Sequence, residues 1–205
     1  MKLNKYVVAL TCTLAAAAHA ETNFYVLGSA GVSRPSVNKS DINKLLESNT
    51  GTTVTSSSID NTDVGYKLQA GYQLTKNFAV EGGYVDLGQA EIKSTTTGGE
   101  IKTDWEAKGW NLDAVAIIPV TGSFSVLAKF GVMQAKVEAK VHSSGASDSS
   151  NATHIAPIFG LGAAYAFNNN LSIRAEAESY SSVGNADKTG RADVYLLSAG
   201  VAYKF

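Results

Sequence analysis

Alternation of apolar and polar side chains runs through most of the chain, and it is most regular from Val64 to Leu74. In that stretch (VGYKLQAGYQL) every second residue is apolar or aromatic, and glycine, lysine or glutamine stands between. A period of two predicts a β-strand whose faces meet different surroundings. The pattern leaves open which face points inward. A soluble sandwich would bury the tyrosines and leucines, whereas a membrane barrel would bury the lysine.

Similar segments recur along the chain and predict an all-β fold with eight strands. The expected strands cover residues 23–32, 63–74, 77–88, 106–118, 124–141, 155–167, 171–180 and 192–205. Their connections alternate between tight turns at 75–77, 119–123 and 168–170, and long polar loops at 33–62, 89–105, 142–154 and 181–191. Short turns at one end and long loops at the other, on an even number of strands, are typical of outer-membrane barrels. We therefore predict an eight-stranded antiparallel up-and-down transmembrane β-barrel with short periplasmic turns and long extracellular loops.

The first twenty residues have the features of an export signal. They begin with lysines, continue as an apolar run and end on Ala18-His19-Ala20, a small-x-small cleavage pattern. We expect a signal peptide at residues 1–20, cleavage near Ala20, and a barrel domain at residues 21–205. The one cysteine, Cys12, lies within this signal, in a poor context for lipid attachment, so the exported chain has none. Export and the barrel pattern together predict the outer membrane of a Gram-negative bacterium.

Aromatic residues gather near the ends of the expected strands, where two girdles would meet the membrane interfaces. The expected girdles comprise Tyr72, Phe78, Phe124, Tyr165, Phe167, Tyr203 and Phe205 by the short turns, with Tyr84 and Trp110 toward the loops. This arrangement favours lipid on the apolar face and predicts outer-membrane lipids, including lipopolysaccharide, as partners. Because 17 basic residues balance 18 acidic ones and form no basic run, nucleic acid is not an expected partner.

The polar face carries charges of both signs on different strands. The residues expected inside the barrel are Lys67, Gln69, Gln73, Glu81, Asp113, Lys129, Arg174 and Glu176. An eight-stranded barrel is just wide enough for side chains to fill it, and buried charges must be paired. We predict a polar plug whose charge network comprises Lys67, Glu81, Asp113, Lys129, Arg174 and Glu176. Its main pair is Glu81 with Arg174, and Lys129 lies between Asp113 and Glu176.

Three stretches carry a family resemblance that spans residues 21–205. They are GYQLTKNFAVEGGYVDLG (71–88), PIFGLGAAYAFNNNLSIRAE (157–176) and the terminal AGVAYKF. These stretches resemble the transmembrane domain of outer membrane protein A and its small relatives that lack the periplasmic peptidoglycan-binding domain. The resemblance implies that Glu81 and Arg174 pair in the interior. Val115 and Ala164 stand where relatives can carry a further Lys–Glu pair.

The resemblance also implies a role for the last strand. A terminal strand that ends in phenylalanine is similar to the signal read by the barrel-assembly machinery, and here it would include Tyr203 and Phe205. We therefore expect the assembly machinery to be a partner of this strand.

Catalysis and metal binding have weak candidates in the third long loop. His142 precedes Ser143 and Ser144, and His154 closes the same loop, but these residues do not make a triad by themselves. His142, His154 and Asp148 lack the tight spacing of a metal site. We expect no enzyme activity, no metal and no cofactor.

The first long loop contains SDINKLLES (residues 40–48), in which Ser40 could cap a short helix that packs on the rim or contacts a partner. The loops are the expected surface for extracellular partners. The predicted function is a structural or surface-interaction role. The alternatives are a narrow channel for small solutes or ions, a lipid-modifying enzyme, and a soluble periplasmic carrier.

Overall fold

The computed structural model describes residues 23–37, 54–60, 62–96, 99–143, 146–185 and 190–205. In this part of the chain the strands are β1 (Phe24–Val37), β2 (Val54–Asp60), β3 (Asp63–Thr75), β4 (Phe78–Thr96), β5 (Gly99–Pro119), β6 (Phe124–Ser143), β7 (Ala146–Ala166), β8 (Leu171–Asn185) and β9 (Gly190–Lys204). All neighbours pair antiparallel. No helix of the described residues is long and apolar enough to cross a membrane.

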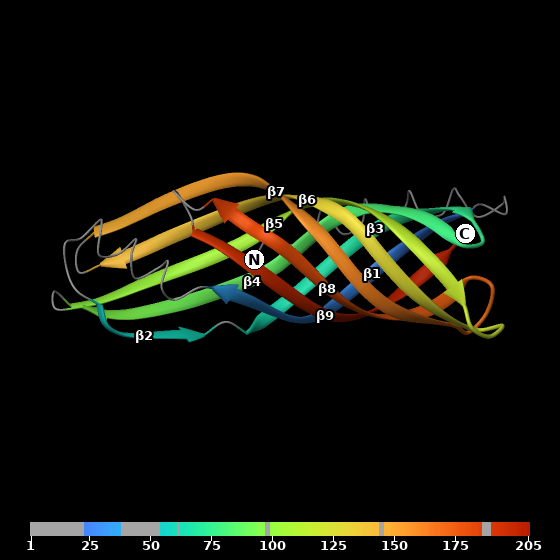
Figure 1. Ribbon diagram of the computed structural model, residues 1–205, viewed down its shortest axis with the longest axis horizontal. Helices are drawn as coiled ribbons and strands as arrows, with labels where there is room; N and C mark the ends of the chain where they lie inside the picture. Colours follow the sequence, from blue (N-terminus) through green and yellow to red (C-terminus); the bar gives the residue numbers. More distant parts are fainter. Residues whose placement is uncertain (1–22, 38–53, 61, 97–98, 144–145, 186–189) are drawn as a thin grey trace, which may run out of the picture.

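Eight of the strands close into a barrel, which confirms the predicted fold class. The sheet runs β4-β3-β1-β9-β8-β7-β6-β5, and pairing of β4 with β5 closes the circle. Figure 1 shows the strands tilted around the long axis, with the carboxyl end of the chain and the short turns at one end. That end is the periplasmic one.

The ninth strand, β2, was not expected, because residues 33–62 read as a loop. Among the described residues it pairs with the far end of β4, from Val54 opposite Thr96 to Asp60 opposite Glu91. Strand β2 therefore lies outside the closed barrel, along the edge of β4 (Figure 1). The helix expected at residues 40–48 lies outside the described residues.

Four strands are much longer than a membrane requires, and here the predicted loop boundaries are wrong. Strands β4 to β7 have 19, 21, 20 and 21 residues, whereas about 9–11 residues span a membrane. Most of the expected loops at 89–105 and 142–154 is therefore strand, and these four strands extend beyond the others in Figure 1. The reason is that inward apolar residues, such as Trp105 and Val137, continue the alternation beyond the barrel rim.

The two faces of the barrel wall are inverted relative to a water-soluble protein. On β3 the side chain of Leu68 is 56% exposed on the outside, whereas its neighbour Lys67 is 2% exposed and points inward. The same alternation places Trp110, Leu161 and Leu197 outside. An apolar outer surface around a charged interior suits a barrel surrounded by lipid.

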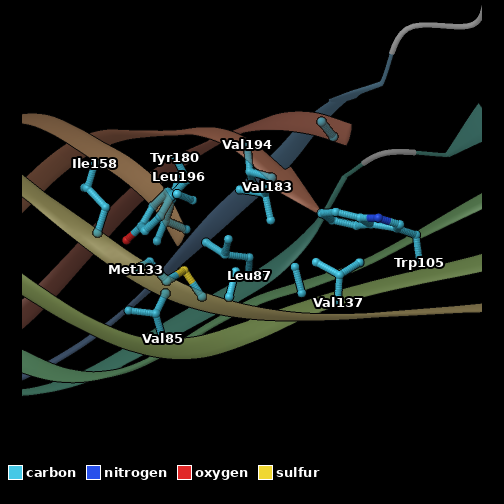
Figure 2. Close-up of a cluster of buried hydrophobic side chains, with 14 of the residues drawn as sticks. Val85, Leu87, Trp105, Met133, Val137, Ile158, Tyr180, Val183, Val194 and Leu196 are labelled. Carbon is cyan, nitrogen blue, oxygen red and sulfur yellow. The ribbon is translucent and has the colours of Figure 1, made fainter. Parts of the chain in front are cut away.

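The interior is not polar throughout, because apolar side chains fill part of it. Toward the extracellular end it is filled by one apolar cluster, the upper apolar layer. This layer comprises Val85, Leu87, Ala90, Trp105, Ala107, Met133, Ala135, Val137, Ala156, Ile158, Tyr180, Val183, Ala192, Val194 and Leu196. Its residues come from β4 to β9, and Figure 2 shows the labelled side chains gathered between the strands. Around Trp105 and Val137 the outward positions are polar, so this part of the barrel has the core of a water-soluble β protein.

The inverted faces predict the accessibility of single cysteines introduced at residues 68, 87 and 76. Leu68→Cys should react with a lipid-soluble maleimide and not with a membrane-impermeant one, because its side chain faces lipid. Leu87→Cys should react with neither, since Leu87 is fully buried in the upper apolar layer. Lys76→Cys, in an exposed turn, is the control that should react with both. Labelling of folded protein in vesicles makes the measurement, and reaction of Leu68→Cys with the impermeant reagent would contradict the assignment.

Candidate functional site

Charged side chains of five strands converge in the middle of the barrel, below the upper apolar layer. We call them the charge network: Lys67 on β3, Glu81 on β4, Asp113 on β5, Lys129 on β6, and Arg174, Glu176 and Glu178 on β8. Each is at most 7% exposed. All six residues expected from the sequence lie here, and Glu178 joins them.

Glu81 contacts two cations and a tyrosine hydroxyl in the charge network. Its Oε1 accepts hydrogen bonds from Nη1 of Arg174 and, at 2.6 Å, from the hydroxyl of Tyr25. Its Oε2 lies 3.0 Å from Nζ of Lys129. The Arg174 guanidinium also lies over the Tyr25 ring, 5.2 Å from its centroid. The structure therefore brings Glu81 and Arg174 together, and it adds Tyr25 and Lys129 to the pair.

Two lysines share the glutamates of β8. Nζ of Lys67 lies 2.7 Å from Oε2 of Glu176 and also contacts Oε2 of Glu178. Nζ of Lys129 lies 3.1 Å from Oε1 of both glutamates. The Tyr180 hydroxyl donates to Glu178 at 3.2 Å. Glu178 could have been found from the sequence, because it continues the period of two set by Arg174 and Glu176.

Asp113 has different partners from those expected. Its Oδ2 accepts hydrogen bonds from Nδ2 of Asn111 and, at 3.1 Å, from Nε2 of Gln69. Of the two carboxylates predicted to flank Lys129, Glu176 lies within ion-pair distance, whereas the hydrogen bonds of Asp113 go to Asn111 and Gln69. Among the described residues the carboxylates within ion-pair distance of Lys129 are Glu81, Glu176 and Glu178.

A glycine on β7 explains why Lys129 reaches across to β8. Gly160 stands between Lys129 on β6 and Glu178 on β8 in the register of the sheet. A Cβ at Gly160 would lie 3.0 Å from Cγ of Glu178 and 3.3 Å from Cβ of Lys129. Without that atom, the two side chains can approach each other over the β7 backbone.

Gly71 has the same effect on the other side of the barrel. It stands between Tyr25 on β1 and Glu81 on β4. A Cβ at Gly71 would lie 2.2 Å from Cζ of Tyr25, which is a steric clash with the ring. The hydrogen bond from Tyr25 to Glu81 therefore requires glycine at this position.

A second apolar cluster lies on the periplasmic side of the charge network. This lower apolar layer comprises Tyr25, Ala79, Val115 and Leu127, with Ile117 and Ala164 packed against it. Val115 and Ala164 are the positions where the family resemblance led us to expect that a further charge pair is missing. Here both belong to an apolar layer, so neither leaves an unpaired charge in the barrel.

The candidate catalytic and metal residues are far apart. His142 and His154 lie on paired strands rather than in a loop, which corrects that expectation: His142 pairs with Ser147, and His154 pairs with Ala135. At about 3.3 Å per residue this register separates the two histidines by roughly 20 Å along the hairpin. Asp148 pairs with Val141, so it is also remote from His154. Within the described residues there is no group of metal-ligating side chains.

The residues of the expected assembly signal lie at the periplasmic end of β9. The rings of Tyr203 and Phe205 meet edge to face with centroids 5.2 Å apart, and Phe205 also lies 6.3 Å from the ring of Phe24. At the other interface Tyr84 and Trp110 make a similar contact at 5.6 Å. The positions suit aromatic girdles, and recognition by the assembly machinery stays a prediction.

An inverted barrel with short turns at one end and aromatic side chains at its borders defines an outer-membrane β-barrel of a Gram-negative bacterium. Residues 19–205 match the family of the OmpA-like transmembrane domain. The chain belongs to this family.

Relatives of known name agree with this assignment. The chain is 33% identical over 137 residues to outer membrane protein A of Salmonella typhi, and 30% identical over 148 residues to that of Klebsiella pneumoniae. These matches cover 66% and 71% of this chain but only 38% and 42% of the relatives, so the chain spans about two fifths of their length.

Solved structures show the same fold. Neisserial surface protein A has a TM-score of 0.58 at 18% identity, and the match covers 90% of this chain and 98% of that one. Outer membrane protein OprG from Pseudomonas aeruginosa has a TM-score of 0.50 at 15% identity, with 89% and 95% covered.

The charge network predicts unequal effects of removing one carboxylate inside and one outside the barrel. Glu81→Gln should lower the free energy of unfolding by about 3–5 kcal/mol, because it leaves buried cations without their partner. Glu106→Gln removes the partner of Lys108 on the half-exposed outer surface, 2.6 Å away, and should cost less than about 1 kcal/mol. Urea titration of both variants in vesicles, followed by gel migration, measures the difference. Equal losses would contradict the buried pairing.

Proposed function

We propose that this protein is a non-enzymatic outer-membrane barrel with a structural or surface-interaction role, and that side chains plug its interior. The observation that carries the proposal is the stacking of the charge network between the upper and lower apolar layers.

The three layers support a closed lumen. An ion crossing the barrel would have to pass the upper apolar layer, where Leu87, Met133 and Ile158 are fully buried. It would then have to separate Glu81 from Arg174 and Lys129, which lie within contact distance in the charge network. Breaking buried charge pairs costs several kcal/mol each. Passage therefore requires rearrangement of both packing and ion pairs.

The extension formed by β4 to β7 supports the surface role. These strands extend as a sheet beyond the lipid-facing part of the barrel. The outward positions of this sheet carry polar side chains such as Gln134, Lys136 and Glu138. Nζ of Lys136 lies 3.0 Å from Oε1 of Glu138, and both are partly exposed. A polar, extended sheet outside the membrane offers an area on which an extracellular partner could bind.

The absence of enzyme activity is part of the proposal. His142 and His154 are separated by the register of the hairpin. Inside the barrel the acidic groups are bound by cations and amides rather than arranged around a nucleophile. This arrangement favours stability of the barrel over acid–base chemistry.

Planar-bilayer recording tests the plug. Purified wild-type protein should show no regular conductance steps, because the lumen is filled. Glu81→Ala should produce brief openings, since it removes the carboxylate that Arg174 and Lys129 share. Glu106→Ala, on the outer surface, is the matched control and should stay silent. Regular steps from the wild-type protein would contradict the plug and favour the narrow-channel alternative.

A further inference from the structure

A cavity of about 280 Å³ lies at the periplasmic end of the barrel, on the side of the lower apolar layer away from the upper one. We call it the periplasmic vestibule. It is lined mainly by Tyr25, Gln73, Ser172, Arg174, Lys204 and the Asn168–Asn170 turn. These residues come from β1, β3, β8, β9 and the connection between β7 and β8.

The vestibule is lined by two cationic side chains, one of which, Arg174, is also paired with Glu81 of the charge network. Of the described residues that line it, Arg174 and Lys204 are the charged ones, and none is an aspartate or glutamate. Nζ of Lys204 donates to Oε1 of Gln73 at 3.1 Å, and this amide is a neutral partner. Lys204 therefore differs from the cations of the charge network, Arg174 included, each of which lies within ion-pair distance of a glutamate.

Arg174 has donors to spare. Its contacts with Glu81 and Glu176 both use Nη1. An arginine presents five N–H donors, so the contacts at Nη1 use only part of its capacity. Because Arg174 lines the vestibule, it connects the cavity directly to the buried charge network.

The floor of the vestibule is shaped by a well-ordered turn. Oδ1 of Asn168 accepts hydrogen bonds from the backbone N–H groups of Asn170 and Leu171 at 2.9 and 2.8 Å. Nδ2 of Asn170 donates to the carbonyl of Lys204 at 2.8 Å. The turn is thereby tied to β9, and it holds Lys204 beside the cavity that Arg174 lines.

We infer that the periplasmic vestibule binds an oxyanion, namely a phosphate or a carboxylate group, between Arg174 and Lys204. A guanidinium presents paired donors to such a group, and charge-assisted bonds are the strong ones. The hydroxyl of Ser172 and the amides at the cavity supply neutral donors. The anion can come from two sources that share this chemistry, a small ion of the periplasm or the phosphate of an inner-leaflet lipid headgroup.

Calorimetric titration with inorganic phosphate tests the site in the folded chain, in a nonionic detergent. Wild-type protein should give saturable binding. Lys204→Gln should weaken it at least about tenfold, because it removes one of two charges. Lys76→Gln removes a lysine from an exposed turn at the same end of the barrel and should bind within about twofold of wild type. Absence of saturable binding by wild type, or equal binding by Lys204→Gln, would overturn the inference.

Ser172→Asp gives a second and independent variant. It places a carboxylate in the vestibule without touching the residues of the charge network, and phosphate binding should be lost. Faster migration of unheated protein on gels shows that the barrel is folded. A folded Ser172→Asp variant that binds phosphate as well as wild type would contradict the site.

The source of the anion is tested with lipid. Protein released from nanodiscs that contain phosphatidylglycerol should retain this lipid in native mass spectra if the headgroup is the ligand, and Lys204→Gln should not retain it. Phosphate binding without lipid retention would assign the site to a small ion. If the protein neither bound phosphate nor retained the lipid, the vestibule would be refuted as an anion site.

Discussion

The structure depends on one constraint, which is that charges inside a narrow barrel must satisfy each other. Seven charged side chains lie in the middle of the lumen, and each is at most 7% exposed. Isolated charges in such surroundings would cost several kcal/mol each. Glu81 therefore accepts from Arg174 and Tyr25 and contacts Lys129, while Glu176 and Glu178 share Lys67 and Lys129. The barrel wall is arranged to allow these contacts.

Glycines and apolar layers make the arrangement feasible. Gly71 gives Tyr25 room to reach Glu81, and Gly160 lets Lys129 meet Glu178 across β7. The upper apolar layer separates the charges from the extracellular end, and the lower apolar layer packs on their periplasmic side, where Arg174 also lines the vestibule. The low-dielectric surroundings strengthen the ion pairs, and they also raise the cost of leaving one partner alone. Stability and closure of the lumen thus have a common physical origin.

Much of this could be predicted from alternation alone. A period of two located all eight barrel strands and the inward positions of Glu81, Arg174 and Lys67. It does so because one face of each strand is apolar toward lipid, and the other carries the polar and charged side chains of the lumen. The predicted strands ended too early, as at residues 89–105. Beyond the membrane the outward positions of a strand are polar, so its sequence resembles that of a loop. The alternation could not assign partners either. Lys129 lies within ion-pair distance of Glu178 across Gly160, and this approach depends on how far the side chains reach into the barrel rather than on their order in the sequence.

A double-mutant cycle on Glu81 and Arg174 tests the central claim most directly. Unfolding free energies of wild type, Glu81→Gln, Arg174→Met and the double variant give the coupling between the two side chains. A buried, shared ion pair predicts a coupling of at least about 2 kcal/mol. The double variant should therefore lose less unfolding free energy than the sum of the losses in the two single variants. The same cycle on Glu106 and Lys108 at the outer surface should give less than about 1 kcal/mol. A coupling near zero between Glu81 and Arg174 would contradict the account.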